Sequence, residues 1–478
     1  MKMNSYKKEF YKYTIIFLFV IGIIFRTYVW LHNISFWCDE SALALNIQNR
    51  TYLGLLKGLD HLQVCPPFFL MLSKLVIDIF NPQTDWSRDL LLRLIPFISS
   101  IVSLPAFYYL LNLLSENIET KFRNTFKLWA FSFMAIMPNA ILYSAQFKQY
   151  STEMLVTIIL MIIFYKMIFK KEYKWWYGFI IAFIPWLSYS ALFIIPSYFL
   201  IMIKKILTPR FYIPAVLTFL SCLVLFVINL KSVINVNYSG MIDFWSVGYA
   251  FIGFNHPTRF FMRFGETMLT YNKLMSVFAG ILMFIPFITY LYKPKDFRLK
   301  LFYSLPIVLT LIASAMNKYP IQARLVLFLT PFFCIVWSYA CENFERWVKY
   351  ILILIIFISY LVFRYPIYSY EIDTYGREIA EYLKQNIKKE DVLLYDSATT
   401  EYEYYNKNNS ILNKSIKLPE VAIDDKDFCV NYVSKLPKGR YYIMVRALSI
   451  DKLLELNSIK ILKVLKKHDK IKTIYFEV

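Results

Sequence analysis

The sequence predicts an all-α polytopic membrane protein with a small C-terminal α/β domain. The composition is one reason, because 58% of the 478 residues are hydrophobic and the mean hydropathy is +0.46, values too apolar for an ordinary soluble protein. A second reason is that many apolar segments approach the length of a membrane-spanning helix. The third is that the composition changes after Arg364, where the chain becomes rich in charge and tyrosine.

The first apolar segment, Thr14 to Leu31, follows a basic opening. No small-residue cleavage site comes after it, so we expect a retained first span rather than a signal peptide. The positive-inside rule then places Lys7, Lys8 and Lys12 in the cytoplasm. The loop that follows, at about 32–92, is therefore predicted to be extracytoplasmic.

The segment Pro66–Phe80 decides the order of the later spans. It is short for a span and contains Lys74 and Asp78, so we expect a helix lying at the membrane interface. If it crossed the membrane, the basic clusters at 121–127 and 170–174 would move outside. The expected topology has about 11 transmembrane helices, placed at 14–31, 93–114, 128–143, 154–169, 175–203 as a tight pair, 213–230, 274–292, 301–315, 325–341 and 350–363. One long tilted helix over 175–203 is the alternative to the pair.

These spans divide the chain into two expected domains. Residues 1–364 form the transmembrane domain, and residues 365–478 form an extracytoplasmic α/β domain. An amphipathic helix is expected at 375–387, and strands at 391–395, 441–445 and 472–477. No catalytic signature stands out in this second domain.

The net charge of +20 does not indicate nucleic-acid binding, because the basic residues fall in short clusters between apolar segments and in the C-terminal tail. They are better explained by the orientation of the spans. The six cysteines show no metal-ligand spacing. Cys38 and Cys65 flank the first outer loop and could form a disulfide there.

Asp39 and Glu40 are the first candidates for chemistry. They follow aromatic residues, Trp30, Phe36 and Trp37, of the kind that mark a membrane–water interface. Carboxylates at this position suit a reaction on a substrate that is anchored in the bilayer. The alternative is a solvated acidic turn between two spans.

Further polar residues are predicted on the same face of the membrane. Charges at this depth are costly unless they are paired or face a wet cavity. Cations there suit an anionic lipid phosphate, and a carboxylate near an acceptor hydroxyl suits a general base. Three of the candidates have a purely structural alternative. Lys148 could be an interfacial lysine that extends its ammonium to water, Arg324 could pair with a helix end, and His61 could be an ordinary loop residue. The candidates are Lys148, Tyr150, Glu153, Tyr319, Arg324 and His61.

Several motifs in order resemble the GT-C fold glycosyltransferases that use polyprenyl-phosphate sugars, among them protein O-mannosyltransferases and the aminoarabinose transferases of lipid A. The resemblance covers about residues 10–340. The motifs are Phe-Trp-Cys-Asp-Glu at 36–40, Gln-Val-Cys-Pro-Pro at 63–67, Arg-Leu-Ile-Pro at 93–96, Tyr-Ser and Lys-Gln-Tyr-Ser within 143–151, and Tyr-Pro followed by Arg within 319–324.

The resemblance implies a GT-C type fold with interfacial helices in the first outer loop, and it implies roles for site residues. Asp39 would be the catalytic base, with Glu40 as its partner in the motif, in a direct displacement that inverts the anomeric carbon. Lys148 and Arg324 would hold the lipid phosphate, and Tyr150 would line the donor pocket.

The sequence departs from this pattern at Gln146, where many relatives carry an acid, and Glu153 could supply that charge instead. No cofactor is required, although Asp39, Glu40 and Glu153 could bind a divalent metal through their oxygens.

The predicted function is sugar transfer from a polyprenyl-phosphate donor to an extracytoplasmic acceptor, which could be a lipid, a glycan or a protein. The expected location is the plasma (inner) membrane. The chief alternative is a transporter or flippase of lipid-linked sugars, but no internal repeat is evident and the ionisable residues gather at outer span ends rather than at the midplane. A polytopic scaffold without catalysis is a third option.

Overall fold

The computed structural model describes residues 2–205, 208–231, 296–322, 324–341, 376–388, 390–395, 400–406, 415–417, 432–444, 460–467 and 470–478. The chain divides into two compact units. The first contains Met1–His32, Tyr52–Ile79 and Leu91–Pro366; the second contains Asn33–Thr51, Phe80–Leu90 and Ile367–Val478. Each unit is described by itself.

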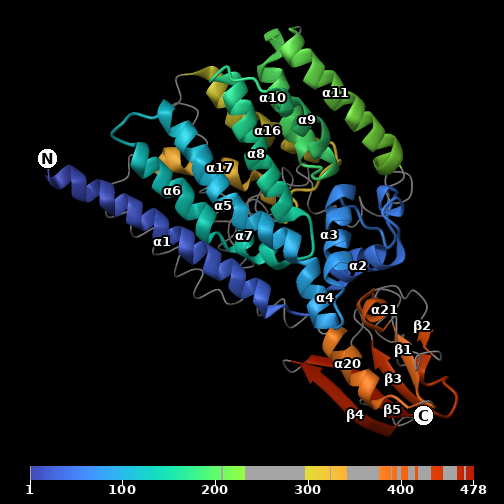
Figure 1. The fold of residues 1–478 in the computed structure, drawn as a ribbon. Coiled ribbons are helices and arrows are strands. Elements are labelled where there is room, and N and C mark those ends of the chain that lie inside the picture. The colour runs from blue at the N-terminus through green and yellow to red at the C-terminus, as the bar shows by residue number, and fades with distance from the viewer. Residues whose placement is uncertain are drawn as a thin grey trace. The chain divides into compact units, whose positions relative to one another are not determined.

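The first unit is a helical bundle (Figure 1). In it α5 packs on α8, α1 on α6, α6 on α17, α9 on α11 and α10 on α16. Its helices are α1 (Lys2–His32), α3 (Pro67–Phe80), α5 (Leu94–Leu114), α6 (Arg123–Ile136), α7 (Pro138–Leu142), α8 (Tyr150–Ile168), α9 (Trp175–Phe183), α10 (Ala191–Ile201), α11 (Pro209–Leu225), α16 (Phe297–Ala315) and α17 (Thr330–Cys341), with short turns η1 (Gly54–Leu56), η2 (Ser115–Asn117), η3 (Tyr143–Ala145), η4 (Ile184–Trp186), η5 (Ile203–Lys205), η6 (Phe226–Leu230) and η8 (Leu327–Leu329).

Five helices of the described residues are long and apolar enough to cross a membrane, or six if a bent pair is one span. They are Glu9–His32, Asp85–Asn117, Tyr150–Ile168, Phe211–Leu230 and Phe297–Ala315. The chain is thus a multi-pass membrane protein, while the expected total of about 11 spans stays a prediction. The expected spans at 274–292 and 350–363 lie outside the described residues.

The helices expected at 175–203 and at 128–143 can be compared with the structure. The apolar segment 175–203 forms two short helices, α9 and α10, so the tight pair is confirmed and the single long helix is wrong. The expected straight span at 128–143 is instead bent by 49° between α6 and α7. The break falls at Pro138, which has no N–H to donate to the carbonyl four residues earlier.

Arg26, in α1, stabilises this break. Its guanidinium is fully buried and donates to the oxygens of Met134 at 3.0 Å and Ala135 at 2.7 Å. The Met134 carbonyl is the one that a residue other than Pro138 would have satisfied within the helix. Arg26 also donates to Ser100 Oγ at 2.8 Å, so one side chain joins α1, α5 and α6.

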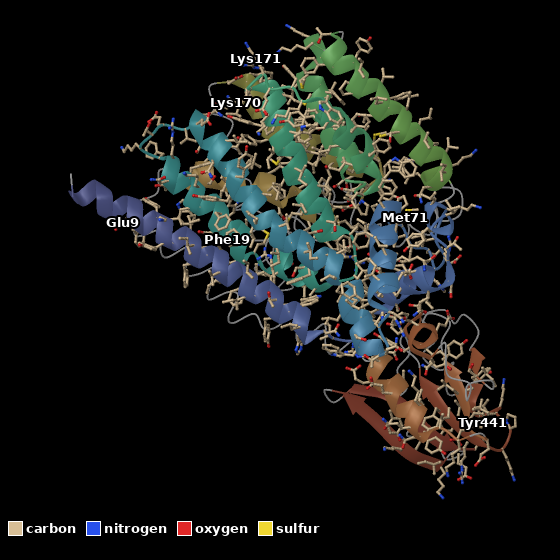
Figure 2. All side chains as sticks on the ribbon, in the orientation of Figure 1. Glu9, Phe19, Met71, Lys170, Lys171 and Tyr441 are labelled. Atoms are coloured by element: carbon tan, nitrogen blue, oxygen red, sulfur yellow. The ribbon has the colours of Figure 1, made fainter. Side chains whose placement is uncertain are left out.

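Basic residues gather at one end of the bundle. Lys170 forms an ion pair with Glu116, and Arg298 lies 5.7 Å from the ring centre of Phe169. Figure 2 labels Lys170 and Lys171, which follow the C-terminal end of α8. The ends of α5 and α8 and the beginning of α16 therefore meet at a basic end.

The helix α3 has one buried and one exposed face. Phe69, Leu70 and Ser73 are buried, whereas Leu75 and Ile79 are exposed. This pattern suits a helix that packs on protein along one side and meets lipid or solvent along the other. Its expected place at the membrane interface stays a prediction.

The second unit contains a mixed five-stranded sheet in the order β2-β1-β3-β5-β4 (Figure 1). β1 is parallel to β2 and β3, while β5 is antiparallel to β3 and β4. The strands are β1 (Val392–Tyr395), β2 (Ile416–Lys417), β3 (Arg440–Met444), β4 (Lys460–Lys467) and β5 (Lys470–Glu477). The strands expected near 391–395, 441–445 and 472–477 are confirmed as β1, β3 and β5.

Within the described residues, four helices also belong to the second unit. The amphipathic helix expected at 375–387 is α20 (Gly376–Asn386), which buries Ile379 and Leu383 against Leu393 and Tyr442 of the sheet. Next to it lies α21 (Thr400–Asn406). The other two come from the first outer loop, α2 (Cys38–Asn49) and α4 (Asp85–Leu92). α2 packs on α21.

Candidate functional site

The central element of the candidate site is the turn that leads into α8. After α7 and η3, residues 146–149 form a short irregular segment in which the Lys148 N–H donates to the Gln146 oxygen at 2.7 Å. The side chains here are almost fully buried, with Lys148 4% exposed and Tyr150 4% exposed. A buried ammonium is costly unless it is hydrogen-bonded, so its partners matter.

Lys148 has a hydrogen-bond partner in the loop between α1 and α3. Lys148 Nζ donates to Gln63 Oε1 at 2.7 Å. Nearby, the thiol of Cys65 donates to Gln149 Oε1 at 3.5 Å. This thiol is free and buried, so the suggested disulfide between Cys65 and Cys38 is wrong. Burial raises the pKa of the Cys65 thiol well above its usual range, and the charge of Lys148 opposes that shift.

Glu153 lies in the first turn of α8, close to the same place. It is 4% exposed, and its carboxylate accepts hydrogen bonds from the backbone N–H groups of Tyr189 and Ser190. These residues form the turn between η4 and α10. The Tyr189 hydroxyl in turn donates to Asn229 Oδ1 at 2.5 Å and lies 3.1 Å from the Cys65 oxygen. Glu153 is therefore bonded to the turn at Tyr189 and Ser190, and that turn is itself bonded to Cys65 and Asn229.

Two aromatic residues extend this cluster. The rings of Tyr143 and Tyr150 pack edge to face with centres 5.6 Å apart. Burial raises the pKa of Tyr319 well above its usual value, and the nearby Glu153 and Tyr150 raise it further. The Tyr319 hydroxyl donates to the Leu325 oxygen at 2.6 Å, which closes the loop between α16 and η8.

Arg324 belongs to that loop. It is half-buried in the turn before η8, and η8 packs on α8. The structure thus gathers Lys148, Tyr150, Glu153 and Tyr319 around the beginning of α8. It places Arg324 in an adjoining segment.

His61 has a different environment. It is exposed, and its backbone is left-handed, with φ of 59°, as is that of Leu62, with φ of 55°. Two successive left-handed residues that are not glycine mark a strained backbone. The described contact of His61 is the donation from Gln63 Nε2 to its backbone oxygen at 3.2 Å. Its imidazole has no described place in the cluster.

Asp39 and Glu40 lie in the second unit, in the first turn of α2. Glu40 is fully buried and Asp39 is half-buried. Carboxylates at this position interact favourably with the positive end of the helix dipole. The residues that precede them are bonded to α20 and α21, as described below.

No group of three or more His, Cys, Asp or Glu side chains within the described ranges is arranged to hold a metal ion. Asp39 and Glu40 belong to one unit and Glu153 to the other, so the suggested oxygen site for a divalent metal stays a hypothesis.

Comparison with solved structures identifies the architecture. The chain is similar to ArnT from Cupriavidus metallidurans, in crystal structures bound to undecaprenyl phosphate and in the apo state, with TM-scores of 0.51 and 0.52. The sequence identity is 12%, and the match covers 95% of this chain and 97% of ArnT. ArnT, a lipid A aminoarabinose transferase, has the GT-C fold. This chain has the GT-C fold as well.

A more distant match is the archaeal oligosaccharyltransferase AglB from Archaeoglobus fulgidus, in complex with an inhibitory peptide and a dolichol-phosphate. It has 13% identity and a TM-score of 0.48 over 92% of this chain and 70% of that chain. The sequence matches no protein-family model and no curated protein. The GT-C fold suspected from the ordered motifs is therefore confirmed by structural similarity alone.

Several residues of the site were not predicted from the sequence. They are neutral polar groups in loops and turns, where no periodic pattern marks them: Gln63, Gln149, Tyr189, Ser190 and Asn229. Two of them lie in motifs of the sequence: Gln63 begins Gln-Val-Cys-Pro-Pro and is the partner of Lys148, and Gln149 belongs to Lys-Gln-Tyr-Ser.

Proposed function

We propose that this protein is an integral membrane glycosyltransferase that transfers a sugar from a polyprenyl-phosphate donor to an extracytoplasmic acceptor. Asp39 takes the proton from the acceptor hydroxyl as its oxygen attacks the anomeric carbon. The bond from that carbon to the phosphate oxygen breaks, and the lipid phosphate leaves as an anion. Attack in line with the leaving group inverts the anomeric configuration.

The observation that carries this proposal is the buried ammonium of Lys148, hydrogen-bonded to the amide oxygen of Gln63. An amide oxygen from a strained loop is an acceptor that a phosphate oxygen can replace with a stronger, charge-assisted bond. Arg324, with its planar pair of donors, is the second residue proposed to hold the phosphate. The GT-C fold supports this role, since its relative ArnT was solved with undecaprenyl phosphate.

The charge distribution supports an orientation. Lys170, Lys171 and Arg298 lie at the end of the bundle opposite to the beginning of α8. The positive-inside rule assigns that end to the cytoplasm. Lys148 and Glu153 are then near the outer leaflet, the N-terminus is cytoplasmic, and the protein belongs in the plasma (inner) membrane.

Glu153 and Tyr319 are proposed to shape the donor pocket together with Tyr150. Gln146, at the position where relatives carry an acid, is 3% exposed. Its amide is neutral, so we assign the acidic role at this turn to Glu153, in the first turn of α8.

The test is a transfer assay on the purified full chain in lipid nanodiscs, with a short-chain polyprenyl-phosphate sugar and a panel of acceptors. Asp39→Asn should reduce turnover at least about a hundredfold, the scale of general-base catalysis. Asp60→Asn, an exposed acid of the same outer loop, is the matched control and should keep its activity.

Full turnover by Asp39→Asn would contradict the role of Asp39 as base. The flippase alternative predicts a different result, in which vesicles with the wild-type chain move the lipid-linked sugar across the bilayer and no acceptor is ever glycosylated.

A further inference from the structure

The segment that leads into Asp39 and Glu40 is bonded throughout to the C-terminal part of the second unit. Arg377 Nη2 donates to the Asn33 oxygen at 2.7 Å, and the Arg377 N–H donates to Ser35 Oγ at 2.8 Å. The Phe36 N–H donates to the Tyr405 hydroxyl at 2.8 Å. The ring of Phe36 also stacks on Tyr404, with centres 5.4 Å apart.

The contact closest to the carboxylates is made by Thr400, the first residue of α21. Its hydroxyl donates to the Cys38 oxygen at 2.8 Å and lies 2.8 Å from Ser41 Oγ. Either hydroxyl can donate to the other, and Ser41 Oγ also lies 3.0 Å from the Cys38 oxygen and 3.2 Å from the Trp37 oxygen. Cys38 and Ser41 are the residues on either side of Asp39 and Glu40 in the chain.

The position of α21 is itself fixed by a buried hydrogen-bond hub, which consists of Asp89 and its three donors. Asp89, in α4, is fully buried and accepts from Arg377 at 2.8 Å, from Tyr404 at 3.1 Å and from Tyr405 at 2.6 Å. A carboxylate with three donors, one of them charged, holds all of its partners in place. The hub thus joins α4, α20 and α21 behind the contact of Thr400 with α2.

The first turn of α2 needs such support from outside. Its N-cap residue is Trp37, and an indole has no oxygen with which to accept a backbone N–H. A catalytic carboxylate must stay within a fraction of an ångström of its working position, which requires side chains that lock the element carrying it.

We propose that α21 positions the catalytic acid, with Thr400 as the residue that locks the first turn of α2. This inference rests on the proposed role of Asp39 as base. The C-terminal α/β unit then takes part in the transfer step indirectly. Thr400 acts as a positioning residue through α2 and does not contact the substrate.

The experiment compares three variants of the full chain in the transfer assay. Thr400→Val keeps the size of the side chain and removes the hydroxyl, and Thr400→Ser restores the hydroxyl. The matched control is Lys384→Ala in α20, whose exposed ion pair with Asp85 is remote from the Thr400 contacts. Each variant is assayed for kcat and for the KM of the lipid donor, with its thermal midpoint in detergent measured alongside.

The proposal predicts that Thr400→Val lowers kcat about tenfold, with an unchanged donor KM. Thr400→Ser and Lys384→Ala should stay near the wild-type kcat. Should Thr400→Val fail to fold, Ser41→Ala removes the other hydroxyl of the same pair and should lower kcat in the same way.

A wild-type kcat in both Thr400→Val and Ser41→Ala overturns the proposal, and so does a rise in donor KM without a fall in kcat. These failures can be told apart from a failure of the proposed function. If Asp39→Asn is inactive while Thr400→Val is fully active, only the positioning role is wrong. If Asp39→Asn is active, the role of Asp39 is wrong whatever Thr400 does.

Discussion

Lys148 Nζ donates to Gln63 Oε1 across 2.7 Å, which joins the beginning of α8 to the first outer loop. The two residues are far apart in the chain, and the loop around Gln63 is strained at His61 and Leu62. The neutral amide oxygen of Gln63 therefore accepts a hydrogen bond from the ammonium that we propose binds the donor phosphate. We propose that donor binding exchanges this hydrogen bond for a stronger, charge-assisted one to phosphate.

Placing a carboxylate at Gln63 should inhibit donor binding. In Gln63→Glu the new acid forms an ion pair with Lys148, and the phosphate must displace it. We expect the donor KM to rise about tenfold or more, since a charge-assisted bond is worth roughly 1.5–3 kcal/mol. The matched control is Gln83→Glu, an exposed glutamine of the same outer loop. An unchanged KM in Gln63→Glu would show that Lys148 does not meet the donor.

Removing the charge of Lys148 should weaken donor binding more than it affects folding. Lys148→Met keeps most of the buried methylene stem and deletes the ammonium. We expect the apparent affinity for the lipid phosphate, measured by scintillation proximity or fluorescence quenching, to fall by about 2 kcal/mol or more. The thermal midpoint should hold or rise, because a buried charge is costly. Wild-type affinity in Lys148→Met would remove the lysine from the site.

Arg26 should be a stability residue rather than a site residue. Arg26→Leu leaves the Met134 and Ala135 carbonyls at the α6–α7 break without their donor. A buried carbonyl left without a donor costs about 1–3 kcal/mol, so the thermal midpoint in detergent should clearly fall. Arg26→Lys keeps the charge but not the branched set of donors, so its loss should be intermediate. A midpoint equal to wild type in Arg26→Leu would contradict this role.

The hub at Asp89 should make the second unit sensitive to alkali. Burial raises the pKa of both Tyr404 and Tyr405 well above the usual value, and the charge of Asp89 raises it further. The unfolded chain releases these protons near pH 10, whereas the folded chain retains them. The free energy of unfolding should therefore fall as the pH rises above about 10.

The variants Tyr404→Phe and Tyr405→Phe isolate this effect. Each lacks one titrating hydroxyl, so its stability should decline less steeply between about pH 10 and 11 than that of the wild type. Chemical unfolding followed by fluorescence at several pH values gives the slopes. If the free energy of unfolding falls with pH at the same rate in all three proteins, Tyr404 and Tyr405 do not cause the loss of stability at alkaline pH.

The sequence predicted those features that leave a local pattern. Apolar length and basic clusters indicated the bundle, and the length of the apolar segment 175–203 indicated the pair α9 and α10. Charged residues at span ends pointed to Lys148 and Glu153, which the structure brings together with Tyr150 and Tyr319. A charge next to an apolar segment is conspicuous because its burial is costly.

Features that depend on long-range pairing were not predicted. The bend at Pro138 had a local signal in the proline, yet its stabilisation by Arg26 comes from another helix. Gln63 and Thr400 are neutral side chains whose partners lie far along the chain. The association of α2 and α4 with α20 and α21 is equally long-range. Such contacts form only in the folded chain, and no periodic pattern in the local sequence predicts them.

The central claim is that the cation before α8 holds the phosphate of the lipid donor. The most direct measurement is a cryo-EM structure of the full chain in nanodiscs with a polyprenyl phosphate bound. We predict a phosphate oxygen about 3 Å from Lys148 Nζ. A phosphate held at the basic end near Lys170 would contradict this claim.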